Sequence, residues 1–492
     1  MDIPFEKTES QFWQQKLYAP VIQEETQEFR LPESLPDIGR VISAWGQPVM
    51  RGKEWRGNHI VLTGGVMVWV LYAPEDGSEP RRVESWIPYS ARVEHHQEEE
   101  GIIRAECLLS SADARNVAGR KLMLRISVGL MVQTMTRRQA RLCSPGQLPG
   151  DIQILERTYP MVLTRETGER AFLADEVVAM ERRPERILYY RLSPRVCERK
   201  VLGSRAVFRG VGELHLLCQD DRQQLFCADL EVPFSQYLDL DGDYDEGAEV
   251  SCVLCVTSLE AEPEGEGVRV RCGLMGQYII NAPAVICCVE DAYSPRRELE
   301  PVMEEVVLPA WLDEQVRQIE LQERLTGEDV PVDAIFFPDL PVVTRQPGGA
   351  EIRIGGSFQT LSAAPDGSLH SRTVRSSRSE TLSTECDTIP CTWLRGGTTL
   401  RKEGNSWAAE ARMDTKLSSV STRPVSMVTG LRAGECRVPD PDRPSIVIRA
   451  RKPEESLWDI AKYCGSTVSA IQRLNKLERE PEENRLLLIP VI

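Results

Sequence analysis

Four aspartates that alternate with other residues form the most metal-like motif of this 492-residue sequence. They stand in the stretch Asp239-Leu-Asp-Gly-Asp-Tyr-Asp245. An EF-hand calcium loop also needs Gly at its sixth position and Glu at its twelfth. Counted from Asp239, those positions hold Tyr244 and Val250. We therefore expect a solvated acidic loop between strands here, and no calcium site.

Cysteine pairs are the second group of residues that could do chemistry. Cys252-Val-Leu-Cys255 has the CxxC spacing of many zinc sites, but it lies in an apolar run typical of a strand. Residues three apart in a strand point to opposite faces, and no second CxxC is present, so we do not expect zinc there. Cys218, Cys272, Cys287 and Cys288 also stand in apolar runs, where a free thiol behaves as a small buried hydrophobic group.

Known catalytic motifs are missing from the sequence. It contains no GxSxG elbow, HExxH helix or Walker loop, and its five histidines limit the choice of a general base. His95 and His96 precede a run of Gln and Glu and are interpreted as a polar hairpin tip. A cell-wall hydrolase would need a catalytic carboxylate or a Cys/His pair, and we find neither. We expect no catalytic residue, no metal, no cofactor and no enzyme.

The sequence around these residues predicts short strands separated by turns. Apolar and polar residues alternate over many short runs, and breaks such as Ala73–Gly77 are rich in Pro, Asp and Gly. Val66–Leu71 is apolar at every position, which indicates a central strand covered on both faces. The pattern predicts a mainly β protein whose antiparallel sheets form sandwiches or barrel-like domains.

An internal repeat indicates how many such domains there are. The stretch Val61–Tyr72 returns as Val207–Cys218 and, more faintly, as Ile352–Ala363. Aligning Gly64, Gly210 and Gly355 gives steps of 146 and 145 residues. A period of this size is that of a complete domain rather than of a solenoid repeat.

The flanks of the repeat agree for the first two copies. Arg40–Ile42 matches Arg186–Leu188, and Ile87–Ser90 matches Val232–Ser235. We therefore predict three tandem β domains, followed by a Pro-rich linker and a small terminal domain. Their predicted bounds are 31–140, 172–292, 299–436, 437–444 and 445–492.

Three segments are less regular. Residues 1–30 are an N-terminal extension, in which Phe12, Trp13, Leu17 and Tyr18 suggest a short amphipathic helix packed on the first domain. The opening of the third domain, Leu308–Leu325, could be a helix or a strand. A Ser- and Arg-rich stretch, Ser371–Ser383, is predicted to be a polar loop that interrupts the sheet.

The terminal segment has the order strand, helix, helix, strand. Ser445–Ala450 reads as a strand, and Ser456 is a good N-cap for a helix that Gly465 ends. Thr467 precedes a second amphipathic helix, and Leu486–Ile489 reads as the closing strand. We predict a small βααβ domain.

The stretch Lys452–Asn475, K-P-E-E-S-L-W-D-I-A-K-Y-C-G-S-T-V-S-A-I-Q-R-L-N, resembles a LysM domain. LysM domains bind glycans that contain N-acetylglucosamine, such as peptidoglycan, in a shallow groove between two loops. The resemblance implies a groove formed by the loop before the first helix and the loop before the last strand. Its residues would be Glu454, Glu455, Ser456, Leu457 and Trp458 on one side, and Glu482, Glu483 and Asn484 on the other.

The chain departs from the LysM pattern in both loops. Glu454-Glu455 replaces the usual Gly-Asp, and Glu482–Asn484 replaces the usual Tyr-Pro-Gly. Asn484 can still adopt the positive φ that Gly would supply. The groove would carry four carboxylates and no aromatic platform on which a sugar ring can stack. Both a glycan and a protein are therefore candidate ligands of this groove. Trp458 is expected to be either a core residue or a surface anchor.

The β domains resemble a family of their own. L-P-E-S-L-P-D-I-G-R-V-I, which begins at Leu31, the strand Gly64–Tyr72 and Ile87–Ser90 are similar to the SPOCS domain of spore-forming bacteria. Tandem SPOCS-like units that end in one LysM resemble mother-cell morphogenetic proteins of the spore coat. These interact with the stage IV sporulation ATPase that forms the basement layer of the coat.

This resemblance implies a non-enzymatic assembly protein that links the coat basement layer to the forespore surface, in the cytoplasm of the mother cell. Its partners would be the coat ATPase or other coat proteins. The alternative is a protein that binds peptidoglycan and targets the cortex or the cell wall.

Charge and hydropathy restrict the partners further. The net charge of -16 and the lack of a long basic cluster argue against nucleic acid as a partner. No run of 18 apolar residues occurs, and the N-terminus has no basic leader or apolar core of a signal peptide. We expect a soluble cytosolic protein without a transmembrane segment.

Overall fold

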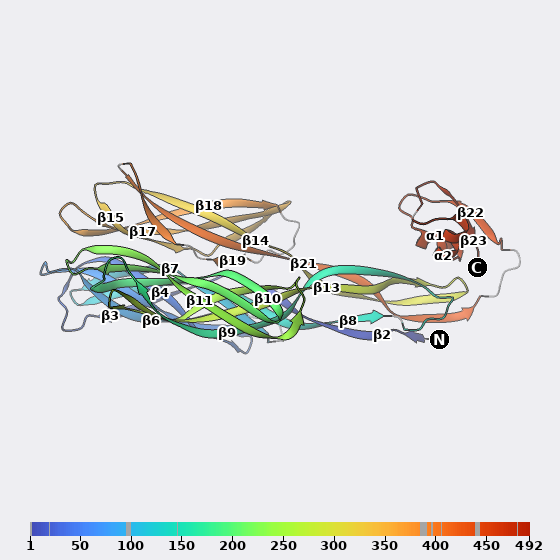
Figure 1. The fold of residues 1–492 in the computed structure, drawn as a ribbon, viewed down its shortest axis with the longest axis horizontal. Helices are drawn as coiled ribbons and strands as arrows, with labels where there is room; N and C mark the ends of the chain where they lie inside the picture. Colours follow the sequence, from blue (N-terminus) through green and yellow to red (C-terminus); the bar gives the residue numbers. More distant parts are fainter. Residues whose placement is uncertain are drawn as a thin grey trace.

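The computed structural model describes residues 2–18, 20–94, 100–144, 146–383, 391–394, 397–404, 406–437, 443–479 and 481–492. The chain is mainly β, as the alternating pattern predicts, and its described residues contain two helices, several sheets and no closed barrel. Figure 1 shows an elongated molecule with long strands at one end and the small helical unit at the other.

The first block of strands covers residues 6–144 and forms two antiparallel sheets. In one sheet β8 pairs with three strands, and in the other the order is β4-β5-β6. The bounds are β2 (Glu6–Leu17), β3 (Val21–Arg30), β4 (Ile38–Arg56), β5 (His59–Pro74), β6 (Arg81–Glu94), β7 (Ile102–Ala118) and β8 (Lys121–Ser144).

The second block covers residues 153–293 and also forms two sheets, ordered β12-β13-β9 and β10-β11. The bounds are β9 (Gln153–Ala179), β10 (Arg186–Gln219), β11 (Leu225–Tyr244), β12 (Glu249–Glu264) and β13 (Gly267–Tyr293).

The third block covers residues 297–436. β21 pairs with β14, β19 and β20 in one sheet, and β17 pairs with β15, β16 and β18 in the other. A short N-terminal strand, β1 (Asp2–Pro4), also pairs with β21. The bounds are β14 (Arg297–Leu325), β15 (Val330–Pro338), β16 (Val342–Gln346), β17 (Gly349–Ala363), β18 (Leu369–Ser383), β19 (Cys391–Leu394), β20 (Thr398–Glu403) and β21 (Ser406–Cys436).

The same pairing plan recurs in the three blocks. The last strand of each pairs with an early strand, as β8 does with β3, β13 with β9 and β21 with β14. It also pairs with the strand before it, as β8 does with β7, β13 with β12 and β21 with β20. The strand pairing therefore repeats from block to block, as the sequence does.

Glycines of the repeat have a common structural reason. A Cβ on Gly64 would lie 2.1 Å from Val49 O, and one on Gly210 would lie 2.0 Å from Arg195 O. In the third block it is Gly356, not the aligned Gly355, that meets a strand carbonyl in this way, with Phe337 O at 2.3 Å. These glycines therefore stand where two strands approach closely, and the third copy is offset by one residue from the sequence alignment.

Two segments differ from the sequence-based expectation. Residues 6–17, predicted to contain a helix, form β2, which pairs with β8 from Glu6↔Ser144 to Leu17↔Gln133. Ser371–Ser383, predicted to be a loop, belongs to β18, which pairs with β17 along its length. Both predictions were wrong because backbone hydrogen bonds to a neighbouring strand fix these segments as strands. The side chains of the segments themselves do not reveal that partner. The opening of the third block is a strand, β14.

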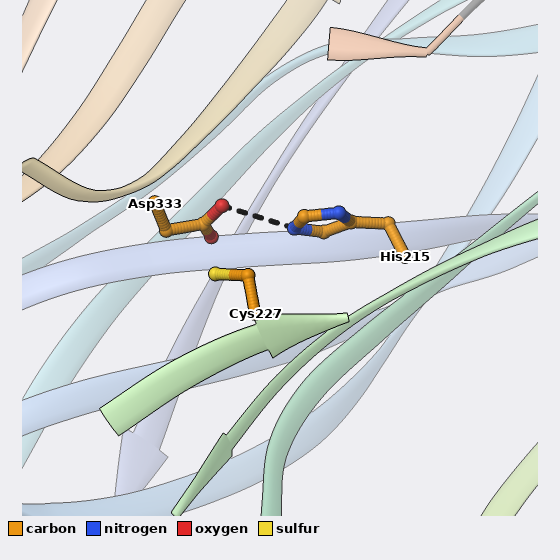
Figure 2. A group of neighbouring side chains, drawn as sticks. All are labelled: His215, Cys227 and Asp333. Carbon is orange, nitrogen blue, oxygen red and sulfur yellow. Dashed lines mark hydrogen bonds and ion pairs between the residues drawn. The ribbon is translucent and has the colours of Figure 1, made fainter. Parts of the chain in front are cut away.

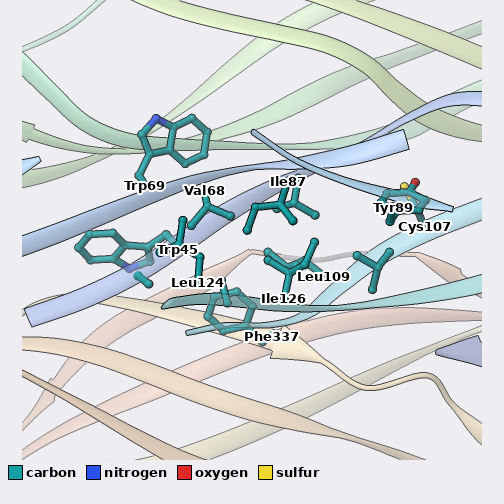
Figure 3. Close-up of a cluster of buried hydrophobic side chains, with 14 of the residues drawn as sticks. Trp45, Val68, Trp69, Ile87, Tyr89, Cys107, Leu109, Leu124, Ile126 and Phe337 are labelled. Carbon is teal, nitrogen blue, oxygen red and sulfur yellow. The ribbon is translucent and has the colours of Figure 1, made fainter. Parts of the chain in front are cut away.

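The largest apolar core joins the three blocks. Val66–Leu71 on β5 is buried except for the half-buried Met67, so the predicted central strand is confirmed. Tyr189 of the second block stacks on Trp45 with ring centroids 4.8 Å apart. Phe337 of the third block lies in the same cluster as Trp45 (Figure 3). The blocks therefore support one another through a shared core.

The ends of the long strands extend away from this core as a stalk (Figure 1). We define the stalk as the paired ends of β2 and β8, of β9 and β13, and of β14 and β21. Its interior holds two apolar clusters, one that includes Phe12, Leu163 and Met427, and one that includes Phe5 and Val289.

The terminal unit, residues 443–492, lies beside the end of the stalk (Figure 1). It consists of β22 (Ile446–Ala450), α1 (Leu457–Cys464), α2 (Val468–Asn475) and β23 (Leu486–Pro490), and β22 pairs antiparallel with β23. The predicted βααβ order is confirmed. Among the described residues, neither helix is long or apolar enough to cross a membrane.

Candidate functional site

Local hydrogen bonds fix the first helix of the terminal unit and the loop before it. Ser456 Oγ accepts from Asp459 N at 3.2 Å, and Asp459 Oδ2 accepts from Ser456 N at 2.9 Å. The Ser456 hydroxyl also donates to Asp459 Oδ2 at 2.5 Å, and this bond, followed by the bond from Ser456 N, lowers the pKa of Asp459 because both stabilise the ionised carboxylate. Gly465 ends the helix with a φ of 65°. The predicted cap at Ser456 and stop at Gly465 are confirmed.

The structure brings the two loops of the predicted groove side by side. Arg451 N donates to Arg485 O at 3.1 Å, and Asn484 N donates to Arg451 O at 2.9 Å. The Arg451 side chain donates to Glu455 O at 2.7 Å and to Pro481 O. Glu454 and Asn484 have φ values of 63° and 60°, so Asn484 adopts the expected positive φ.

The eight predicted groove residues differ widely in exposure. Glu454, Glu482, Glu483 and Asn484 are exposed, whereas Glu455 and Ser456 are half-buried. Glu455 is tied down, because it accepts from the Arg449 guanidinium and from Lys452 N. The remaining two, Leu457 and Trp458, are buried, with 1% and 9% of their surface exposed. The loops therefore present carboxylates, and neither buried side chain offers a free face to a ligand.

Trp458 contacts the stalk instead of the groove. Its indole Nε1 donates to Asp291 Oδ2 at 2.8 Å, and its ring meets the Tyr293 ring edge-on with centroids 4.7 Å apart. Lys462 Nζ lies 2.7 Å from the same carboxylate oxygen, and Tyr293 Oη donates to Ser466 O at 3.0 Å. Burial, followed by the charge of Asp291, raises the pKa of Tyr293 well above its usual value, so this hydroxyl stays a donor. The sequence gives no signal for this contact, because its two sides are far apart in the chain.

The outer face of the small sheet is apolar and exposed. Ile446 and Ile448 of β22 are 51% and 66% exposed, and Leu486 and Leu488 of β23 are 68% and 40% exposed. Ile448 pairs directly with Leu488, and Leu486 with Ala450. We call Ile446, Ile448, Leu486 and Leu488 the outer face. On the opposite face of the sheet, Leu487 and Ile489 are buried. The sequence contains one sign of this outer face. Every residue of Leu486–Ile489 is apolar, although only one face of the sheet is covered.

A second group of reactive side chains lies between the second and third blocks. His215, Cys227 and Asp333 place their nitrogen, sulfur and oxygen atoms within 4.8 Å of one another, a spacing that could hold a metal ion. Burial, followed by Asp333, raises the pKa of Cys227 to about 12. Burial alone would lower the pKa of His215, but Asp333 and Asp229 outweigh it and raise that pKa well above its usual value. Without a metal, thiol and imidazolium are both protonated, which does not suit a Cys/His nucleophile.

The other motifs occupy structural positions. Cys252 and Cys255 are buried in two different cores, so the prediction that they face opposite ways is confirmed. The aspartates of residues 239–245 are exposed as predicted, but Asp239, Asp241 and Asp243 lie on β11 rather than in a loop.

Among the cysteines named from the sequence, Cys218, Cys252, Cys272 and Cys288 are buried. The prediction was wrong for Cys287, which is exposed, because it and its buried neighbour Cys288 point to opposite faces of β13. His95 and His96 lie outside the described residues.

Comparisons with known proteins do not identify the chain. No protein-family model matches it, and neither a curated protein nor a solved structure does. Membership of the SPOCS and LysM families therefore stays a prediction from the sequence.

Proposed function

We propose that this chain is a non-enzymatic assembly protein of the bacterial spore envelope. In this proposal three tandem SPOCS-like β-sandwich domains form the body and a LysM-like domain forms the terminal unit. The chain links the basement layer of the coat to the forespore surface, on the mother-cell side. The sequence resemblance supports the location in the spore envelope. The exposed apolar outer face of the terminal unit is the single observation that carries the proposal of binding to a partner protein.

The body suits a supporting role. Its three blocks repeat one pairing plan and share a core that includes Trp45, Tyr189 and Phe337. The stalk then holds the terminal unit at one end of the molecule through Asp291 and Tyr293. Because the attachment is specific, the outer face is presented in a defined orientation. Presentation of this kind lowers the entropy that a partner must lose on binding.

The outer face favours a protein partner over a glycan. Fully burying a Leu or Ile side chain contributes about 1.5–3 kcal/mol. Ile448, Leu486 and Leu488 keep between 40% and 68% of their surface exposed, so each can contribute roughly 1 kcal/mol when a partner covers it. Exposed apolar side chains that are contiguous mark interaction sites in proteins. The partner that we propose is the stage IV sporulation ATPase of the coat.

A pull-down from sporulating cells tests this proposal. We expect the wild-type chain to retain coat proteins, and the double variant Ile448→Glu, Leu488→Glu to lose them, because each glutamate would be desolvated by the partner. Val285→Glu is the control: Val285 is 73% exposed on β13, so a glutamate there adds a negative charge away from the outer face. Retention of no coat protein by the wild type, or equal retention by all three chains, would contradict the proposal.

Peptidoglycan binding is the alternative, and the adjacent loops of the predicted groove favour it. If glycan is the ligand, the wild-type chain sediments with purified peptidoglycan, and the exposed-loop variant Glu482→Ala, Glu483→Ala changes that sedimentation. The Ile448→Glu, Leu488→Glu variant would then sediment like the wild type. A wild-type chain that stays in solution would remove this alternative.

A further inference from the structure

Three strands from two blocks bring a nitrogen, a sulfur and an oxygen donor together. His215 stands on β10, Cys227 on the neighbouring strand β11, and Asp333 on β15 of the third block. The three donor atoms lie within 4.8 Å of one another (Figure 2). The ligands of a tetrahedral zinc ion, each about 2.0–2.3 Å from the metal, have separations that fit within this limit.

The imidazole is already oriented as a ligand. His215 Nδ1 lies 2.6 Å from Asp229 Oδ1, directly across the strand pair, and Nε2 lies 3.0 Å from Asp333 Oδ1. Metal-binding histidines commonly donate their second ring N–H to a carboxylate, which fixes the ring and its tautomer. Asp229 takes this position here, and Nε2 points at the other two donors.

The carboxylate of Asp333 has an unused buried oxygen. Asp333 is 2% exposed, and among the described residues its Oδ2 has no hydrogen-bond partner. Figure 2 shows the Cys227 sulfur on the side of this oxygen. The His215 ring lies between Asp333 and Asp229, and the Asp229 side chain is 70% exposed, so Asp229 is also solvated. Within the described part of the chain, the buried Oδ2 of Asp333 has neither a protein partner nor exposure to solvent; leaving such an oxygen unpaired is costly, and a divalent cation bound to it would remove that cost.

We propose that a zinc ion binds His215 Nε2, Cys227 Sγ and the Asp333 carboxylate and so fastens the second block to the third. Zinc accepts all three donor types. Its charge removes the thiol and imidazolium protons, which pass to solvent. A pocket of about 550 Å³ is lined by His215, Asp229 and residues 334–336 of the third block, and in this proposal water from it completes the coordination. Local motifs could not reveal this site, because its ligands come from three strands.

Cobalt substitution of the full-length, chelator-treated protein tests the site. Co²⁺ bound to a thiolate gives a sulfur-to-metal charge-transfer band, and tetrahedral Co²⁺ absorbs strongly in the visible range. We expect one equivalent of Co²⁺ to give both signals and Zn²⁺ to displace it. Cys227→Ser should abolish the charge-transfer band, whereas Cys197→Ser, which changes an exposed thiol, should leave it unchanged.

A second variant keeps the test independent of folding. The Asp229 side chain is 70% exposed, so Asp229→Asn should leave the fold intact and weaken metal affinity about 10- to 100-fold by removing the carboxylate charge that raises the basicity of the imidazole. A wild-type protein without a charge-transfer band, or a Cys227→Ser variant that keeps the band, would overturn the proposal. Unchanged affinity in Asp229→Asn would also overturn it, and a metal-free ion triad would then explain the three side chains.

Discussion

Asp291 supplies the charged contacts between the stalk and the terminal unit, and replacing it with alanine gives a quantitative test of this docking. The variant removes the hydrogen bond from Trp458 Nε1 and the ion pair with Lys462. A hydrogen bond to a charged group contributes about 1.5–3 kcal/mol. The ion pair adds at most about 1 kcal/mol, because Lys462 is 44% exposed. We expect a total loss of about 1.5–4 kcal/mol, which weakens docking roughly 10- to 900-fold.

The assay measures this loss as a dissociation constant. Residues 443–492 have their own buried cluster, which includes Leu457, Ile460, Ile471, Leu487 and Ile489, so they can be prepared as a separate polypeptide. Calorimetric titration of this polypeptide into residues 1–437 gives the affinity for the wild type and for each variant.

The control variant, Lys462→Ala, removes only the ion pair and should weaken docking by no more than about fivefold. An Asp291→Ala affinity within twofold of the wild type would refute the docking contact, and so would equal losses in the two variants. Circular dichroism of the separate polypeptide checks that α1 remains folded.

Two further predictions concern the body of the protein. Gly210→Ala should lower the free energy of unfolding by about 1–3 kcal/mol, measured by heat or denaturant, because its Cβ would meet Arg195 O. The control is Gly150→Ala, which should change stability little because no atom lies near its Cβ. Equal effects of the two variants would contradict the close approach given as the reason for the repeated glycines. Arg297 lowers the pKa of Asp151, so this carboxylate stabilises the fold above the unfolded pKa of about 3.9 and the effect is lost as pH falls through the lower folded pKa. In unfolding measured between about pH 5 and 2, Asp151→Asn should lose that part of the acid dependence, and an unchanged profile would contradict it.

Features with a local cause could be predicted from the sequence. The continuous apolar run Val66–Leu71 indicated a central strand, because burial on both faces requires apolar side chains at every position. The caps at Ser456 and Gly465 follow from side-chain and backbone chemistry within a few residues. The positive φ of Asn484 is of the same kind.

Features that depend on distant partners could not be predicted. Phe12 and Trp13 suggested a helix, yet β8 supplies a partner strand that fixes residues 6–17 as β2. Trp458 could have been a groove residue, but Asp291 and Tyr293, which lie far away in the sequence, hold it against the stalk. Tertiary contacts of this kind override local preference.

The affinity of the full-length chain for the purified coat ATPase tests the central claim most directly. The wild type should bind saturably, and Ile448→Glu, Leu488→Glu should bind at least about tenfold more weakly, since about 1.4 kcal/mol corresponds to a factor of ten. Val285→Glu should bind like the wild type. No binding by the wild type, or the same dissociation constant for all three proteins, would contradict the claim that this chain assembles the envelope through the outer face.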